Sequence, residues 1–432
     1  MRRLPSTLLL LAALTAPPAA AQGLPPALPD EVGLAAPRLA LIDQLLEESV
    51  ARGDVAGAVT LVARHGRVVA IDSAGFQDLA RRVPMGAGTL FRIGSMSKAI
   101  TSAAALILVE EGRLRLADPV ARFIPAFANP RVALASADPD ERATPTLVPV
   151  RRPITVRDLL THQSGITYGF MDEGPVGDRY RAAGVSDGIA LRDEPIAANV
   201  ERLAALPLAA HPGTEFRYGL STDVLGRVIE VASGESLAEF LRQRIFEPLG
   251  MADTRFYVDD ARLARLAVPY TRERGRLRPI GATERFGELL LAGVGYRGSE
   301  RYFSGGSGLV STAGDYARFL QMILNGGELD GVRVLSPKSI ERFTADASGN
   351  LATLPLGPGT GFSLGFQVIT DMGLATEPGS NGTISWSGIY GTSFWADPEE
   401  QLIGIVMIQL FPSRAVTLDE RVRAIIYGAV TD

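Results

Sequence analysis

The chain has no cysteine and only three histidines, His65, His162 and His211, among its 432 residues. The lack of cysteine excludes disulfides, thiolate metal sites, iron–sulfur clusters and a cysteine nucleophile. The scarcity of histidine argues against a histidine-rich metal centre, and we expect neither a metal nor a cofactor. The net charge of −5 indicates no excess of basic residues, so no nucleic-acid partner is expected.

The first 21 residues have the pattern of an export signal. Two arginines at positions 2 and 3 precede a short apolar stretch at 8–13, and three alanines at 19–21 resemble a cleavage site. The apolar stretch is too short for a stable membrane span, and no later stretch reaches about 18 consecutive apolar residues. We therefore expect residues 1–21 to be a cleaved signal peptide, in preference to a membrane anchor or a disordered tail. The mature protein would be periplasmic or secreted, with no transmembrane segment.

Strand patterns occur at both ends of the chain, and helical patterns occupy the middle. Residues 22–37 are rich in proline and are predicted to be a linker, followed by an amphipathic helix over 39–50. Two β-branched runs around a short turn predict a hairpin. The predicted strands are 58–63, 68–73, 363–370, 382–389, 391–396 and 402–410, and a helix over 419–430 closes the chain.

The middle of the chain reads as helices separated by long loops. Three segments resemble capping boxes, and Ser236-x-x-Glu239 matches better than Thr155-x-x-Asp158 or the Thr312 segment. Polar segments at 131–152, 171–195 and 272–303 are interpreted as insertions or lids. The simplest assembly is one antiparallel sheet from both chain ends, flanked by helices, with an inserted, mainly helical subdomain. This α/β (α+β) fold class gives one catalytic domain over 38–430, with a sheet subdomain near 38–110 and 300–430 and a helical subdomain near 111–299.

Ser95 and Lys98 form the motif with the clearest chemistry. They precede an apolar run through Val109, which is typical of a buried helix. Ser95 would lie in the first turn, where free backbone N–H groups favour a developing anion. Lys98 at i+3 would share its face of the helix. Because desolvation disfavours the charged form of an amine, a partly buried Lys98 could accept the serine proton. Taken alone, the motif also fits a capped helix with a surface lysine.

Four blocks, which occur in the family's order, make a resemblance to a known family specific. The resemblance covers most of residues 38–430. The sequence resembles the serine β-lactamase-type hydrolases, which include class C β-lactamases, D,D-carboxypeptidases and family VIII carboxylesterases. The blocks are Leu90-Phe91-Arg92-Ile93-Gly94-Ser95-Met96-Ser97-Lys98, Leu159-Leu160-Thr161-His162-Gln163-Ser164-Gly165, Pro212-Gly213-Thr214-Glu215-Phe216-Arg217-Tyr218 and Gly305-Gly306-Ser307-Gly308-Leu309-Val310-Ser311-Thr312.

The resemblance implies a β-lactamase/transpeptidase-like fold with Ser95, Lys98 and Tyr218 as catalytic residues. Tyr218 matches the tyrosine of the family's Tyr-x-Asn element and would share the general-base role with Lys98. The third position of that element is Leu220 in this chain, so the amide that binds the side chain of a β-lactam is missing. His162 belongs to a matching block but is interpreted as structural.

The family's Lys-Thr-Gly strand corresponds to Trp386-Ser387-Gly388, followed by Ile389. The resemblance implies substrate binding along this strand and an oxyanion hole formed by the N–H groups of Ser95 and Ile389. Gly388 would let the substrate approach the strand edge. Trp386 replaces a lysine that would bind a carboxylate, and offers an apolar face and one N–H donor. It also fits a packed aromatic residue.

The expected function is therefore carboxylic ester hydrolysis through an acyl-enzyme on Ser95, with a small-molecule ester as substrate. One alternative is a β-lactamase or a D-amino-acid-specific peptidase that acts on a β-lactam or a peptide. Another is a non-catalytic binding protein that keeps the fold. The Tyr-x-Leu and Trp-x-Gly forms resemble the family VIII esterases, and this resemblance favours the ester.

Overall fold

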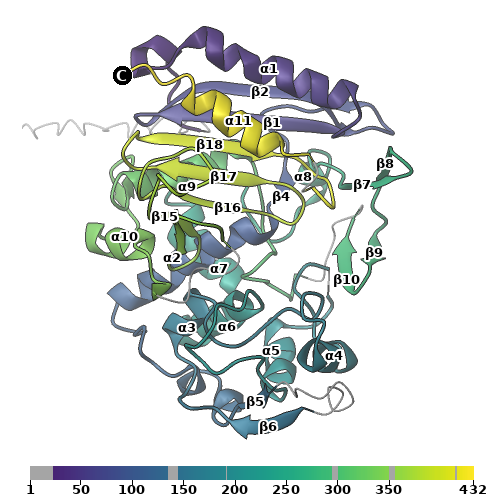
Figure 1. Ribbon diagram of the computed structural model, residues 1–432, viewed down its shortest axis with the longest axis vertical. Coiled ribbons are helices and arrows are strands. Elements are labelled where there is room, and N and C mark those ends of the chain that lie inside the picture. The colour runs from purple at the N-terminus through teal and green to yellow at the C-terminus, as the bar shows by residue number, and fades with distance from the viewer. Residues whose placement is uncertain (1–22, 135–144, 191, 294–299, 350–355, 414–415) are drawn as a thin grey trace, which may run out of the picture.

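An eight-stranded antiparallel sheet forms the upper half of the molecule (Figure 1). The computed structural model describes residues 23–134, 145–190, 192–293, 300–349, 356–413 and 416–432. The strand order is β14-β15-β16-β17-β18-β1-β2-β3, so strands from the two ends of the chain meet where β18 pairs with β1. The bounds are β14 Thr360–Phe362, β15 Gln367–Ile369, β16 Ile384–Ser387, β17 Ser393–Asp397, β18 Leu402–Met407, β1 Gly57–Arg64, β2 Arg67–Asp78 and β3 Val83–Pro84.

Helices cover both faces of the sheet, because alternate residues of a strand point to opposite faces. Val59 and Leu61 of β1 join a large core with helices α2 (Ser97–Glu110) and α9 (Ala313–Leu324). Ala58 and Val62 join a second core with α1 (Ala36–Ala51) and α11 (Leu418–Tyr427). Every residue of β1 is therefore buried, which explains why its apolar run does not alternate with polar residues.

The lower half of the molecule is built from short helices and small hairpins (Figure 1). Its helices are α3 Val156–Leu160, α4 Pro175–Ala182, α5 Ile196–Ala204, α6 Ser221–Ser233 and α7 Leu237–Leu241, followed by a π turn at Arg242–Phe246. Its hairpins pair β5 Arg131–Leu134 with β6 Thr146–Pro149 and β9 Thr283–Phe286 with β10 Leu289–Ala292. Helix α8 (Asp260–Leu263) and the hairpin of β7 (Tyr270–Glu273) and β8 (Arg276–Pro279) lie higher, beside the large sheet (Figure 1). Helix α6 packs against α2, so the helix that follows Ser95 and carries Lys98 lies between the two halves.

The remaining elements are short. Strand β4 (Phe91–Arg92) pairs with β11 (Val310–Ser311), β12 (Glu328–Leu329) pairs with β13 (Val332–Arg333), and α10 spans Pro337–Thr344. Four 3₁₀ turns occupy Pro29–Val32, Gly94–Met96, Val120–Arg122 and Pro125–Phe127. Among the described residues, no helix combines the length and apolarity that a membrane span requires.

The structure corrects two details of the sequence prediction. The strand expected over 363–370 is shorter, because the chain turns at 363–366 after β14, where the Ser363 N–H donates to the Phe366 carbonyl, and only β15 lies within that range. The capping box is complete at Thr155 and incomplete at Ser236. The Glu239 carboxylate bonds Arg242 and Gln243 instead of returning to the backbone of Ser236.

The segment expected as a linker is attached to the sheet from residue 23 onward. Leu24 is buried in the main core, and the Ala27 N–H donates to the Val68 carbonyl. Helix α1 begins at residue 36, within the range assigned to the linker. Proline removes N–H donors but does not prevent a segment from burying its apolar side chains. The signal peptide predicted at 1–21 lies outside the described residues.

Candidate active site

Ser95 lies in a tight turn between strand β4 and helix α2. The turn, Gly94–Met96, is a single 3₁₀ turn, and α2 begins at Ser97. Gly94 adopts a left-handed backbone with φ of 50°, and a Cβ atom there would come within 3.0 Å of the Ile389 amide nitrogen. Two constraints therefore require glycine at position 94: the left-handed backbone angle and the close approach of the segment that contains Ile389.

Lys98 is fully buried and donates three hydrogen bonds. Its Nζ lies 3.1 Å from Ser95 Oγ, 3.1 Å from Tyr168 Oη and 2.8 Å from the Gly306 carbonyl oxygen. The three acceptors match the three protons of an ammonium group. The sequence prediction that Lys98 lies beside Ser95 on one face of the helix is therefore matched by the geometry.

Tyr168 is a site residue that the sequence analysis missed. It is buried, and its hydroxyl is the phenol that Lys98 contacts directly. Burial, reinforced by the nearby Tyr218 and Asp223, raises the pKa of Tyr168 well above its ordinary value, so this phenol stays protonated. The only signal in the sequence is its position three residues after the matching block that ends at Gly165.

Tyr218 is also at the site, but it meets Lys98 through its ring. Lys98 Nζ lies 4.6 Å from the centre of the Tyr218 ring, within the range of a cation–π contact. The Tyr218 hydroxyl accepts a hydrogen bond of 3.2 Å from Trp386 Nε1. The N–H that was expected to face the substrate therefore has a protein partner, and the two rings pack 5.5 Å apart.

His162 supports the Tyr218 ring. The two ring centres lie 4.7 Å apart, and His162 Nδ1 accepts a long hydrogen bond from the Gly219 amide. Burial and the charge of Lys98 hold the pKa of His162 well below its ordinary value, so the imidazole is neutral. His65 and His211 do not line the cleft described below.

The Gly305-Gly306 segment packs tightly between α2 and α6. A Cβ atom on Gly305 would come within 2.7 Å of the Thr222 carbonyl oxygen, and one on Gly306 within 2.5 Å of Asp223 Oδ2. Side chains at these two positions would displace the carbonyl that accepts from Lys98. Leu220 begins α6 within the main core, and is not part of the cleft lining.

The end of strand β16 forms the other wall of the site. Ser387 is exposed, whereas Gly388 is buried against the segment that carries the nucleophile. A Cβ atom on Gly388 would lie 2.3 Å from the Ile93 carbonyl oxygen. Gly388 thus permits the close approach of the Ser95 turn, and it also lines the cleft, so its predicted role in the approach of substrate stays a prediction. The amide of Ile389 lies next to the same turn.

A cleft of about 760 Å³ joins these groups. It contains Ser95, both tyrosines and Trp386, Ser387, Gly388 and Ile389, so the structure brings the predicted oxyanion and substrate-binding residues together. Lys98 lies behind its wall. Five apolar side chains line the cleft near the site: Phe170, Met171, Ile189, Phe216 and Phe411.

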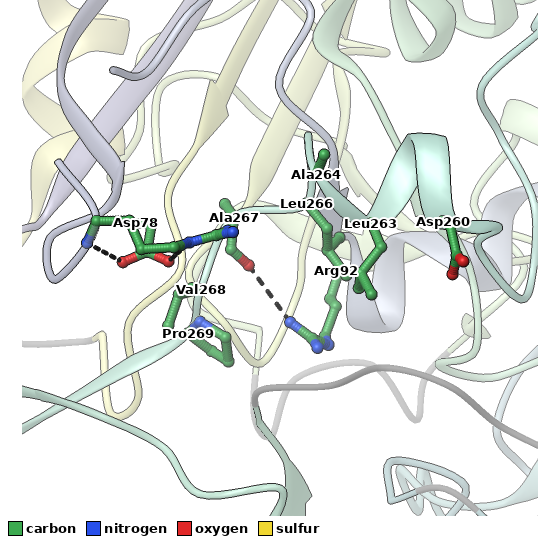
Figure 2. A pocket seen from close by; sticks show the side chains of 10 residues that line it. Asp78, Arg92, Asp260, Leu263, Ala264, Leu266, Ala267, Val268 and Pro269 are labelled. Atoms are coloured by element: carbon green, nitrogen blue, oxygen red, sulfur yellow. Dashed lines mark hydrogen bonds and ion pairs between the residues drawn. The ribbon is translucent and has the colours of Figure 1, made fainter. Parts of the chain in front are cut away.

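A separate pocket of about 380 Å³ lies beyond the far end of β4 (Figure 2). Asp78 pairs with Arg81 there, while Arg92 donates to the Ala267 and Gly293 carbonyls. None of the predicted site residues lines this pocket. The two carbonyls hold the Arg92 side chain, which belongs to the strand that leads to Ser95.

The described residues contain no group of three or more histidine or acidic side chains arranged to hold a metal ion. The polar atoms at the site are a serine hydroxyl, an ammonium group, two phenols and backbone amides. These groups can carry nucleophilic attack, proton transfer and stabilisation of an oxyanion.

The site combines a half-exposed serine with a buried lysine that is hydrogen-bonded to it, at the start of a helix and beside a sheet edge. This arrangement is that of a serine hydrolase of the S-x-x-K type. Comparison with known proteins identifies the family. The chain belongs to the Beta-lactamase family, whose model matches residues 42–427.

Three relatives show the breadth of that family. Protein Rv1367c of Mycobacterium tuberculosis is 37% identical over 84% of this chain and 88% of its own. Esterase EstB of Burkholderia gladioli is 35% identical over 85% of this chain and 88% of its own. The structure of EstCE1, described as a hydrolase with promiscuous acyltransferase activity, superposes with a TM-score of 0.77 at 31% identity, covering 91% of this chain and 98% of that one. The expected β-lactamase/transpeptidase-like fold and the family resemblance are confirmed.

Proposed function

We propose that the protein is a carboxylesterase that acts through an acyl-enzyme on Ser95. The contact of 3.1 Å between Lys98 Nζ and Ser95 Oγ carries this proposal, because it links a nucleophile to a base inside a cleft. The resemblance to esterase EstB supports ester substrates.

In the first step, Ser95 Oγ attacks the ester carbonyl carbon while its proton passes to Lys98, which must first have given up one ammonium proton to solvent. The N–H groups of Ser95 and Ile389 donate to the oxyanion that forms. The C–O bond to the alcohol then breaks, and the alcohol leaves with the proton, delivered from Lys98 directly or through the Tyr218 hydroxyl. Water attacks the acyl-enzyme by the same steps in reverse and releases the acid.

Tyr168 and Tyr218 have different roles in this proposal. Tyr168 is buried and holds Lys98 beside Ser95 through its hydroxyl. Tyr218 is half-buried at the cleft wall, where it can meet a leaving alcohol. Trp386 fixes the Tyr218 hydroxyl by donating to it.

An ester is favoured over a β-lactam because two polar side chains expected in a lactamase are absent. Leu220 is buried in the core and Trp386 is engaged with Tyr218, so neither offers a group for a β-lactam amide or carboxylate. The aromatic and aliphatic side chains of the cleft suit an uncharged acyl or alcohol group, although Glu377, Asp419, Glu420 and Arg423 also line the cleft. A second candidate is acyl transfer to an alcohol in place of water, because EstCE1 is a hydrolase with promiscuous acyltransferase activity.

Parallel assays with a p-nitrophenyl ester and nitrocefin test the substrate, and a fluorophosphonate probe with mass spectrometry tests the nucleophile. We expect ester turnover and labelling at Ser95, and a loss of about 10⁴- to 10⁶-fold in kcat for Ser95→Ala. Ser97→Ala is a matched control, because its hydroxyl only accepts from the Leu309 amide. Fast nitrocefin turnover without esterase activity would overturn the ester proposal, and wild-type activity of Ser95→Ala would overturn the nucleophile.

We also propose that the chain is exported with removal of residues 1–21. N-terminal sequencing of protein recovered from the periplasm or medium should begin at Gln22. Recovery of active protein only from the cytoplasm, with Met1 or Arg2 first, would contradict this proposal.

A further inference from the structure

A buried carboxylate lies behind the lysine, on the side away from the cleft. Asp223 lies in the first turn of α6 and is only 1% exposed. Its Oδ1 accepts a hydrogen bond of 2.6 Å from Ser304, and no described side chain donates to its Oδ2. Burying a carboxylate costs free energy unless hydrogen bonds or a nearby cation compensate for its charge.

The second oxygen faces the groups that hold Lys98. A Cβ atom added to Gly306 would lie 2.5 Å from Asp223 Oδ2 and 3.5 Å from Tyr168 Oη. The Gly306 carbonyl and the Tyr168 hydroxyl are two of the three acceptors of the Lys98 ammonium group. The Gly306 residue therefore separates the carboxylate from the lysine, and a side chain larger than hydrogen would push them apart.

We infer that Asp223 is a positioning residue whose negative charge stabilises the protonated form of Lys98 while Ser95 attacks. The inference rests on the proposed function, in which Lys98 takes up the serine proton. A fixed negative charge behind the base stabilises the cation that forms, as the aspartate of a Ser-His-Asp triad does for its histidine. Asp223 acts through Lys98 and does not touch the substrate.

The surrounding charges are consistent with this role. Burial raises the pKa of Asp223 to about 6, although the Ser304 hydroxyl, the charge of Lys98 and the backbone N–H groups of Gly306 and of Asp223 itself all act to lower it. The other titratable groups that face Asp223 are Tyr168, Asp187 and Tyr302. Burial and the Asp223 charge raise the pKa of both tyrosines, which therefore stay neutral, and Lys98 is the cation that interacts with Asp223.

Asp223→Asn tests the inference through the pH dependence of ester hydrolysis. Removing the charge makes Lys98 easier to deprotonate and a weaker base. The acidic limb of kcat/KM should then move by about one pH unit to lower pH. The plateau above the limb should fall about three- to tenfold. A purely structural loss would lower the plateau without moving the limb.

Asp315→Asn is the matched control. Asp315 is also a buried carboxylate in the first turn of a helix, α9, with a raised pKa caused mainly by burial. It bonds Asp253 and Thr254, not the lysine network. We expect its acidic limb to coincide with that of wild type. An unmoved or upward-moving limb in Asp223→Asn, or an equal shift in Asp315→Asn, would overturn the inference.

Ser304→Ala gives a second test that does not depend on the folding of Asp223→Asn. It removes the hydrogen bond that lowers the pKa of Asp223 but leaves the charge in place at pH 8. We expect kcat/KM within about threefold of wild type at pH 8, and a larger relative loss between pH 8 and pH 6. Equal ratios in the two proteins would count against the charge of Asp223. Fluorophosphonate labelling of Ser95 in every variant shows that the nucleophile is intact, so failure of this inference is distinguished from failure of the esterase proposal.

Discussion

Replacing Gly388 with alanine should damage catalysis far more than it damages the fold. The new methyl carbon would lie 2.3 Å from the Ile93 carbonyl oxygen and 2.4 Å from Thr392 Oγ1. Non-bonded atoms of this kind normally keep about 3.5 Å apart, so the two segments must separate by about 1 Å. The Ile93 carbonyl cannot turn away easily, because it accepts hydrogen bonds from Thr392 Oγ1 and the Met96 amide.

The shift would act directly on the proposed oxyanion hole. Ile93 precedes the Ser95 turn by one residue, and Ile389 follows Gly388, so the two proposed donors lie on the segments that are forced apart. A misplacement of about 1 Å costs on the order of 100-fold in rate. Overpacking of this size costs about 1–3 kcal/mol of stability, which a domain of this size can tolerate.

The assay is ester hydrolysis at saturating and limiting substrate, with thermal unfolding measured on the same samples. We expect kcat to fall about 100-fold in Gly388→Ala. Gly86→Ala is the control, because a Cβ atom at Gly86 meets no atom within 4 Å and its backbone φ is not positive. If folded Gly388→Ala keeps its kcat within twofold of wild type, the reasoning about the placement of Ile389 and Ser95 is refuted.

Three further predictions concern the aromatic groups around the lysine. Tyr168→Phe removes the phenol that accepts from Lys98, and kcat should fall about 10- to 100-fold with little change in KM, as steady-state kinetics would show. Trp386→Phe keeps the ring but removes the donor to Tyr218, and should lower kcat by about tenfold; unchanged kinetics would exclude a role for that hydrogen bond. His162→Gln tests how the protonation of His162 affects stability. The pKa of His162 is lower in the folded protein than in the unfolded chain, so the unfolded chain takes up the proton first as the pH falls. Wild type should therefore lose stability relative to the variant below about pH 6.5. Chemical denaturation of both proteins at pH 7.5 and pH 5.5 measures this difference, and a constant difference would contradict it.

The sequence predicted the sheet well because burial patterns act locally. The hairpin of β1 and β2, the strands β16, β17 and β18, and the closing helix α11 all lie where apolar periodicity placed them. The sequence prediction failed near Gly365, where the chain reverses between β14 and β15 although the run of apolar residues in the sequence is not interrupted. A short turn inside an apolar stretch leaves little trace in its periodicity.

The site was predictable only where its residues lie close in sequence or match a family motif. Ser95 and Lys98 are three residues apart, in the 3₁₀ turn Gly94–Met96 and the first turn of α2, so their contact follows from local helical geometry. The partners of Tyr168 and Trp386 are 70 and 168 residues away in the sequence, and no local pattern encodes such contacts. The packing of Gly388 against the Ile93 carbonyl was missed for the same reason, because the two residues lie far apart in the sequence.

The pairing of β1 with β18 has a consequence for how the molecule is made. Val59 pairs with Met407, so β1 cannot join β18 before residue 407 has been synthesised. Contacts of such sequence separation are slow to form, because a long loop must be ordered first. The oxyanion donor proposed at Ile389 also comes from this late segment. A nascent chain that already carries Ser95 and Lys98 therefore lacks a complete site, and esterase activity should appear only after the C-terminal strands have joined the sheet.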